Sequence, residues 1–257
     1  MITSSHNPKI AQVRSLLSRR QAREEAQLFV LEGARLAEEA LAAGHQPQLV
    51  FFSSEITGRG RGVLEGFIQS GAEIEEVSPD LLDSLSATET SQGLLAVFPY
   101  LDLPLPQTTD FVLIADQVRD PGNLGTLLRS AAAAGVQAVL LAHGTTDPYS
   151  PKVMRAGMGA HFHLPVRSLG WAEIIQICHP RLKLYLAEAG AGTPCWQLDL
   201  SQPVGLVVGG EAEGASAEAR QAVDGLVTIP MPGKSESLNA AIAASILLFE
   251  IVRQRSI

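Results

Sequence analysis

The chain has 257 residues, of which 46% are hydrophobic, 18% charged and 5% aromatic. This composition is typical of a globular protein with one large or two ordinary domains, and it excludes a disordered, collagen-like or coiled-coil chain. The formal net charge of −8 at neutral pH argues, taken as a whole, against a nucleic-acid partner, because binding to phosphates depends on Lys and Arg.

The charge is unevenly distributed along the chain. Residues 1–35 carry six Lys and Arg against three Glu, a formal charge of +3. Residues 36–100 carry two Arg against ten Asp and Glu, a charge of −8, and the rest of the chain carries −3. Charge alone favours a solvated helix face for the basic N-terminal arm, but such an arm is also a local footprint that can bind phosphates.

Membrane and secretory segments are not indicated by the sequence. The longest apolar run, residues 240–249, is too short to cross a bilayer, and no apolar segment of a signal peptide follows the N-terminal charges. Cys178 and Cys195 form neither a disulfide framework nor a CxxC pair. A reducing cytoplasm is therefore the expected compartment.

The first hundred residues predict a small α/β domain. Residues 8–42 have a helical pattern, which a strand over 28–32 interrupts and Gly44 ends. A strand follows at 49–52, then a helix and a strand, up to a last apolar run at 93–98.

A proline-rich linker follows this domain. Three prolines lie within residues 99–106, where they prevent a helix or an inner strand. We therefore expect a first domain over 1–100, a linker over 101–109 and a second domain over 110–257.

Short apolar runs alternate with helices throughout the second domain. This rhythm predicts a mostly parallel sheet with helices on both faces, and such sheets bind ligands beyond the carboxyl ends of their strands. Asn123 is the expected N-cap of the first helix, and Gly135 its end. The expected strands are 111–116, 138–142, 164–166, 182–189, 204–210 and 226–230, and the expected helices are 123–135, 150–160, 171–177, 217–223 and 238–253.

The common nucleotide and nucleophile motifs are absent from the sequence. It contains no GxGxxG opening a first helix, no GxxxxGK[ST] and no GxSxG. His161 and His163 are two residues apart and would permit a metal site, but no third ligand is suggested nearby. Core or surface histidines are therefore favoured, and no metal is expected.

Three segments place glycine and polar residues directly after predicted strands. The first is DQVRDPGNLGTLLRSA, with Asn123 and Arg129, the second is LVVGGEAEGAS, with Glu211, and the third is IPMPGKSESLNAAIAAS, with Ser237 and Asn239. Each has an ordinary explanation as a capped turn. Because parallel strands end at one edge of a sheet, the three together gather a carboxylate, two carboxamides, a hydroxyl and a guanidinium, which indicates a ligand site.

In this order and spacing, the three segments resemble the motifs of the SpoU (TrmH-like) branch of the SPOUT RNA methyltransferases. The intervening YSPKVMRAGMGAHFHLPV is also similar to that family, although Gly157 stands where Ser is commoner. The resemblance covers residues 110–254. Residues 1–100, with TSSHNPKI and FVLEGARLAEEAL, resemble the ribosomal-protein-like substrate-binding domain that precedes the catalytic domain in many members.

The resemblance implies methyl transfer from S-adenosylmethionine to a ribose 2′-hydroxyl of RNA, with S-adenosylhomocysteine as the product. It implies a deep trefoil knot from about Leu206 to the last helix, with the cofactor bound in the knot. Small side chains in the last helix, from Ala240 to Ser245, fit tight packing there, although they also suit any helix. The matching cofactor positions are Gly209, Ile229, Met231, Ser237 and Leu238.

The same resemblance assigns catalytic roles. Arg129 matches the family's catalytic arginine, which has been proposed as a general base. Because a guanidinium is almost always protonated, we expect it to grip a substrate phosphate and orient the 2′-hydroxyl. Asn123 and Asn239 would hold the arginine and the ribose, Glu211 would orient the arginine or a loop, and Ser237 would support the cofactor or the hydroxyl.

The implied partners are RNA and a second copy of the chain. The apolar positions Leu238, Ile242, Leu248, Phe249 and Val252 are candidates for a homodimer interface near the knot, with burial inside their own domain as the simpler expectation. The expected RNA-facing residues are Arg14, Arg19, Arg20, Arg23, Arg35, Arg119, Lys152 and Arg155.

Ribosomal RNA of the 23S type is the expected substrate, and tRNA is the alternative. A non-catalytic RNA-binding protein of the same fold is a second hypothesis, which the intact set of polar residues disfavours. A nucleotide-dependent enzyme of the ordinary doubly wound type is a third, disfavoured by the missing phosphate loop.

Overall fold

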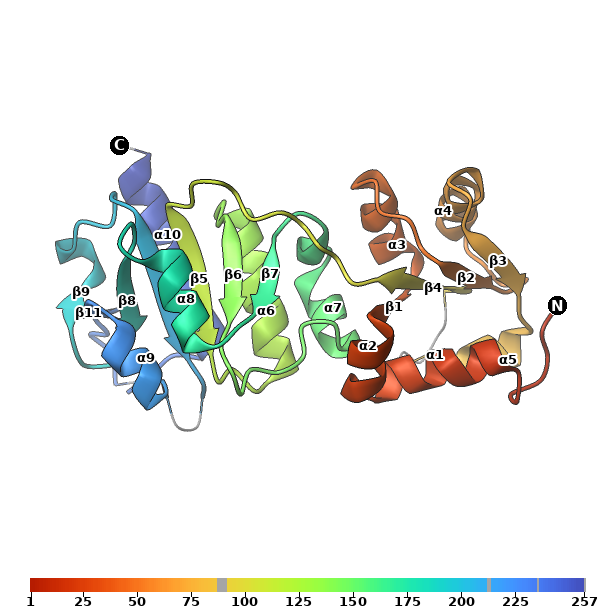
Figure 1. Cartoon of the computed structure of the whole chain (residues 1–257), viewed down its shortest axis with the longest axis horizontal. Coiled ribbons are helices and arrows are strands. Elements are labelled where there is room, and N and C mark those ends of the chain that lie inside the picture. Colours follow the sequence, from red (N-terminus) through yellow and green to blue (C-terminus); the bar gives the residue numbers. More distant parts are fainter. Residues whose placement is uncertain (87–91, 212–213, 235, 257) are drawn as a thin grey trace. The chain divides into compact units, whose positions relative to one another are not determined.

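The computed structural model describes residues 1–86, 92–211, 214–234 and 236–256, and it divides into two units (Figure 1). The first unit comprises Met1–Leu101 together with Tyr149–Phe162. The second unit comprises Asp102–Pro148 and His163–Ile257. The segment 149–162, expected within one continuous second domain, thus belongs to the first unit.

A four-stranded sheet in the order β1-β4-β2-β3 organises the first unit. The central strand β4 runs antiparallel to β1 and β2, whereas β2 and β3 are parallel. The elements are α1 (Pro8–Ser18), α2 (Arg20–Ala26), β1 (Leu28–Glu32), α3 (Ala34–Ala42), β2 (Leu49–Phe52), α4 (Gly58–Gln69), β3 (Glu73–Glu76), α5 (Pro79–Asp83), β4 (Leu94–Pro99), α7 (Pro151–Gly157) and the 3-10 turn η1 (Ala160–Phe162).

Apolar side chains cover both faces of this sheet. Phe29 and Phe98 pack on one face against α3 and α4, while Val30 and Val97 pack on the other against α1 and α5. Strand β4 is buried on both faces, which explains its continuous apolar sequence. The strands predicted at 28–32, 49–52 and 93–98, and the glycine end of α3 at Gly44, are confirmed.

The segment 149–162 completes the first of these two cores. The Tyr149 ring stacks on Tyr100 with 4.1 Å between centroids and lies 4.9 Å from Phe29. Its hydroxyl accepts a hydrogen bond from the backbone N–H of Leu101 at 3.1 Å. Met154 and Phe162 are buried in the same core. These contacts explain why the segment belongs to the first unit.

A seven-stranded parallel sheet in the order β7-β6-β5-β10-β8-β11-β9 organises the second unit, as the alternation of strands and helices predicts. Strand β9 was not expected, and β7 begins at Val166 rather than at residue 164. The elements are β5 (Phe111–Asp116), α6 (Pro121–Ala133), β6 (Ala138–Leu141), β7 (Val166–Ser168), α8 (Trp171–Cys178), β8 (Lys183–Ala187), β9 (Thr193–Pro194), η2 (Cys195–Gln197), β10 (Val204–Gly209), α9 (Ala217–Ala222), β11 (Gly225–Thr228) and α10 (Ala240–Arg255).

Helices cover the second sheet on both faces. Ile174 and Cys178 of α8 and Ala219 of α9 are buried in one core with the strands, and this burial raises the pKa of the Cys178 thiol to about 11. Helix α10 packs against α6 and β10, with the hydroxyls of Ser130 and Ser245 2.7 Å apart. None of the helices that the structure describes is both long and apolar enough to cross a membrane.

Two helix starts differ in detail from expectation. The N-cap of α6 is Asp120, whose carboxylate accepts the N–H of Asn123 at 2.8 Å, so Asn123 lies inside the first turn. This change frees the Asn123 side chain for other partners. Helix α10 begins at Ala240 rather than at residue 238, because Asn239 is its N-cap.

We predict that Tyr149→Ala destabilises the first unit by about 3 kcal/mol, because it removes a buried ring from that core. Tyr149→Phe, which keeps the ring and loses the hydroxyl, should cost about 1 kcal/mol. Hydrogen exchange of the full chain would measure this as lost protection in β1 and β4, with β5 unaffected. Unchanged protection of β1 and β4 in Tyr149→Ala would contradict the assignment of this segment.

Candidate functional site

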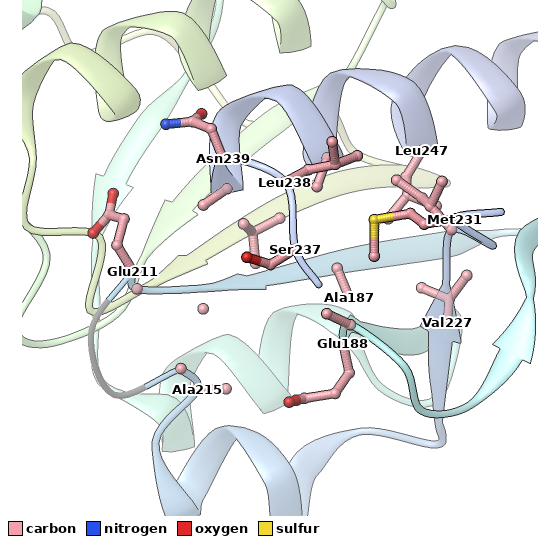
Figure 2. Close-up of a pocket in the computed structure, with 18 residues that line it drawn as sticks. Ala187, Glu188, Glu211, Ala215, Val227, Met231, Ser237, Leu238, Asn239 and Leu247 are labelled. Atoms are coloured by element: carbon pink, nitrogen blue, oxygen red, sulfur yellow. The ribbon is translucent and has the colours of Figure 1, made fainter. Parts of the chain in front are cut away.

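A pocket of about 470 Å³ lies at the carboxyl edge of the second sheet, where β8, β10 and β11 end beside the start of α10. Figure 2 shows Glu211 and Asn239 at one end of it, and Val227, Met231 and Leu247 at the other. The residues that line it are Ala187, Glu188, Ala189, Val208, Gly209, Gly210, Glu211, Gly214, Ala215, Val227, Ile229, Met231, Ser237, Leu238, Asn239, Ala240, Ala243 and Leu247.

Glycine is required on the β10 side of the pocket by close backbone packing. A Cβ at Gly209 would lie 2.5 Å from the backbone N of Ala215, and a Cβ at Gly210 would clash with the carbonyl oxygen of Gln117. Gly210 and Gly214 exchange two backbone hydrogen bonds of 3.1 Å, and Gly214 has a positive φ of 70°. The glycines thus fold the chain back at the edge of the sheet.

A chain of hydrogen bonds joins the three segments that follow β5, β10 and β11. Asn239 caps α10 with its Oδ1, which accepts the N–H groups of Ala241 and Ile242 at 3.0 and 3.2 Å. Its Nδ2 donates to Oδ1 of Asn123 at 2.9 Å, and Nδ2 of Asn123 donates to Oε1 of Glu211 at 2.5 Å. The helix cap therefore fixes the orientation of both amides.

Most of the residues predicted for catalysis and the cofactor lie together. Asn123 is hydrogen-bonded to two residues of the pocket wall, Glu211 and Asn239. Seven of the others line the pocket directly, namely Gly209, Glu211, Ile229, Met231, Ser237, Leu238 and Asn239.

Arg129 is the exception among these residues. It is exposed on α6 and absent from the pocket wall, and its side chain makes no hydrogen bond or ion pair with any residue that the structure describes. Its guanidinium is thus available to a ligand that approaches from solvent.

Two acidic residues were missed by the sequence analysis. Glu188 lines the pocket after β8 and pairs with Arg220 of α9 at 2.9 Å. Asp116, the last residue of β5, is buried and accepts hydrogen bonds from Trp171 and Ser216. Both follow an apolar run directly, which is the signal that could have identified them.

The predicted RNA-facing residues differ in burial and fall into three groups. Arg23 is only 4% exposed, and its guanidinium donates to the backbone carbonyl of Leu16, so it stabilises the α1–α2 junction and does not face RNA. Arg155 is half-buried and lies 3.6 Å from Glu32. The remaining six, Arg14, Arg19, Arg20, Arg35, Arg119 and Lys152, are exposed.

The structure also places His161, His163 and Lys9. His161 is buried in η1 of the first unit, whereas His163 is exposed in the second. Lys9 of the basic arm forms ion pairs with Glu73 and Glu75, and these hydrogen bonds raise its pKa. In the described part of the chain, no three His, Cys, Asp or Glu side chains are arranged to hold a metal ion.

Comparison with known proteins agrees with this architecture. Residues 110–249 match the SpoU rRNA Methylase family, and residues 7–96 match the MRM3-like substrate binding domain. The chain is 33% identical to the 23S rRNA (guanosine(2553)-2′-O)-methyltransferase RlmP of Bacillus subtilis (strain 168), covering 97% of this chain and 98% of that one. It is 32% identical to the mitochondrial rRNA methyltransferase 3 of Homo sapiens, covering 96% of this chain and 72% of the relative.

Solved structures of similar proteins share the fold over nearly the whole chain. The AdoMet-bound rRNA methyltransferase from Sinorhizobium meliloti has a TM-score of 0.87 and 29% identity, covering 98% of this chain and 97% of that one. The SpoU methyltransferase AviRb from Streptomyces viridochromogenes, in complex with AdoMet, has a TM-score of 0.84 and 30% identity, covering 97% and 99%. With a family model that spans more than half of its length and relatives that match almost all of it, the protein belongs to the SpoU rRNA methylase family.

Proposed function

We propose that the protein transfers the methyl group of S-adenosylmethionine to a ribose 2′-hydroxyl of ribosomal RNA. The observation that carries this proposal is the hydrogen-bonded chain from Asn239 through Asn123 to Glu211 at one end of a pocket large enough for a small molecule. The bacterial and mitochondrial relatives, which are named as rRNA methyltransferases, support the reaction and the class of RNA.

The residues of the pocket fit S-adenosylmethionine. The pocket volume of about 470 Å³ lies in the usual range for small-molecule binding sites. Ile229, Met231 and Leu238 would provide apolar contacts for the adenine, and Gly209 would bring the backbone close to it. The cofactor supplies a methyl group already activated by the sulfonium charge. Glu211 adds a carboxylate to the pocket wall that suits a positively charged ligand, whereas the charge of Glu188 is paired with Arg220.

The second part of the site receives the ribose. Arg129 lies on the same helix as Asn123, and its free guanidinium suits a bidentate grip on an RNA phosphate. Hydrogen bonds to Asn239 and Glu211 fix the orientation of the Asn123 amide, which would help to position the ribose. Ser237, on the pocket wall, would support the cofactor or the hydroxyl. Orientation of the 2′-oxygen is the main contribution of these residues to the rate.

The first unit is the proposed RNA-binding part of the protein. Exposed Arg14, Arg19, Arg20 and Arg35 lie on or beside its helices, and Arg119 and Lys152 add two further cations. A small number of arginines implies salt-sensitive affinity, with selectivity from the shape of the RNA. A tRNA substrate, or RNA binding without catalysis, remains the alternative to be tested.

An exposed apolar stripe on and before α10 supports a homodimer. Leu238, Ile242, Ile246 and Phe249 are 38%, 49%, 42% and 49% exposed and recur every three or four residues, so they share one helix face. Leu248 of the expected stripe is instead fully buried in its own unit. A second copy of the chain would cover this face.

A C-terminal trefoil knot and a cytoplasmic location complete the proposal.

We expect the purified protein to protect one ribose of unmodified ribosomal RNA from alkaline cleavage when S-adenosylmethionine is present, because a 2′-O-methyl group blocks that cleavage. Arg129→Ala should lower kcat about 100-fold, because the ribose loses its orienting contact, and leave cofactor binding unchanged. Mapping of cleavage-resistant positions together with calorimetry measures both quantities.

Arg181→Ala is the matched control, since Arg181 is an exposed arginine of the second unit away from the pocket wall. Unchanged methyl transfer in Arg129→Ala would refute its assignment. Methylation of tRNA but not of ribosomal RNA would identify tRNA as the substrate. RNA binding without methyl transfer would favour the non-catalytic alternative.

The triple variant Arg14→Ala, Arg19→Ala, Arg20→Ala should weaken RNA binding and reduce the slope of log K against log salt concentration by about 2 to 3, because each lost phosphate contact removes about 0.7 to 0.9 units. Filter binding at several salt concentrations measures the slope. The double variant Arg59→Ala, Arg61→Ala removes exposed arginines from the acidic segment and should leave the slope unchanged.

Phe249→Glu should convert a dimer to a monomer, because it places a charge within the apolar stripe, where a second copy would bury it. Sedimentation equilibrium measures the mass. Ile68→Glu changes an equally exposed apolar residue on α4 and should leave the mass unchanged. A wild-type protein that sediments as a monomer at all concentrations would exclude the homodimer.

A further inference from the structure

Asp116 is a buried carboxylate that the reaction proposed above does not use. It ends β5, is 1% exposed and stands in register with Gly209 at the end of β10. A carboxylate is costly to bury unless hydrogen bonds satisfy its oxygens. Its partners therefore show what it holds in place.

The carboxylate of Asp116 accepts hydrogen bonds from three donor groups on Ser216 and Trp171. Oδ2 accepts the backbone N–H of Ser216 at 2.6 Å, and Oδ1 accepts the hydroxyl of Ser216 at 3.1 Å and the indole N–H of Trp171 at 3.0 Å. Ser216 is also the N-cap of α9, where its hydroxyl accepts the N–H of Ala219 at 3.1 Å. A carboxylate suits this environment, whereas an amide would turn a donor toward one of these donors.

Two of the three hydrogen bonds go to the chain that forms one wall of the pocket. Glu211, Gly214 and Ala215 line the pocket between β10 and α9, and Ser216 follows them directly. At its β10 end this connection is closed by the Gly210–Gly214 hydrogen bonds. At its α9 end it is held by Asp116, which does not itself line the pocket.

We propose that Asp116 is a positioning residue for cofactor binding. By anchoring Ser216, it fixes the segment Gly214–Ser216, so that Gly214 and Ala215 form the pocket wall. Gly214 in turn holds Gly210, the neighbour of Glu211, through two backbone hydrogen bonds. This inference rests on the proposed function, because it takes the pocket as the cofactor site. It assigns to the end of β5 a role in the wall built by β10.

The test uses the full chain with Asp116→Asn, and measures the Kd for S-adenosylhomocysteine by calorimetry and the exchange of the Gly214 to Ala217 amides. We expect Kd to rise about tenfold and these amides to exchange faster, with β5 and β10 as protected as before. In turnover, KM for the cofactor should rise more than kcat falls. Trp171→Phe is the matched control, because it removes the one donor outside the connection, and should change Kd less than twofold.

Ser216 gives a second, milder series. Ser216→Ala keeps the backbone donor and should give an intermediate Kd, and Ser216→Thr, which restores a hydroxyl, should recover most of the affinity. If Asp116→Asn does not fold, this pair decides the question: equal Kd values for Ala, Thr and wild type would overturn the proposal. So would an Asp116→Asn variant with reduced thermal stability and unchanged Kd. A wild-type protein that binds no S-adenosylhomocysteine refutes the proposed function instead, and unchanged exchange at Gly214 to Ala217 in Asp116→Asn would then refute the anchoring role on its own.

Discussion

The position of β10 between β5 and β8 is the constraint on which the second unit depends. Because all three strands are parallel, their hydrogen-bond registers fix where each one ends. Asp116 stands opposite Gly209, and Val208 stands opposite Ala187. The connections that leave these strands therefore meet at one level of the same edge. A pocket at that edge follows from the strand order, and the residues that line it come from separate segments between Ala187 and Leu247.

Polar groups at this edge are satisfied by one another as well as by the backbone. Asn239 caps α10 and orients Asn123, which in turn holds Glu211, while Asp116 anchors Ser216. The connection after β10 is thus held from two sides, once through Glu211 and once through Ser216. Pre-organisation of this kind reduces the ordering that a ligand must impose when it binds, which suits a reaction that depends on orientation.

The net charge of the protein does not show where its charged side chains lie or which of them are paired. The acidic segment supplies β3, an edge strand whose Glu73 and Glu75 hold Lys9 of the basic arm. Charge on an edge strand also opposes pairing with other chains. Arg23, counted with the arm, is buried, and its guanidinium donates to the backbone carbonyl of Leu16. Arg14, Arg19, Arg20 and Arg35 are exposed in the first unit, with Arg20 paired to Glu24, so the net value of −8 does not by itself exclude an RNA partner.

The sequence by itself determined the parallel sheet, most of its strands and the family. Strands buried on both faces need continuous apolar runs, as in β5 and β10, and polar residues that follow such runs predict a site at the strand ends. Short or weakly buried elements left no such pattern, so β9 was missed and β7 misplaced. The tertiary structure alone decided the partners of single polar side chains, both nearby ones, as for Asp120 and Arg23, and distant ones, as for Asp116 and Ser216. In the structure the N-cap of α6 is Asp120 instead of the expected Asn123, and Arg23 and Asp116 are buried. Residues 149–162 belong to the first unit. The sequence pattern indicates which faces of a helix or strand are apolar. The partner of a polar side chain depends instead on which segment of the chain packs beside it.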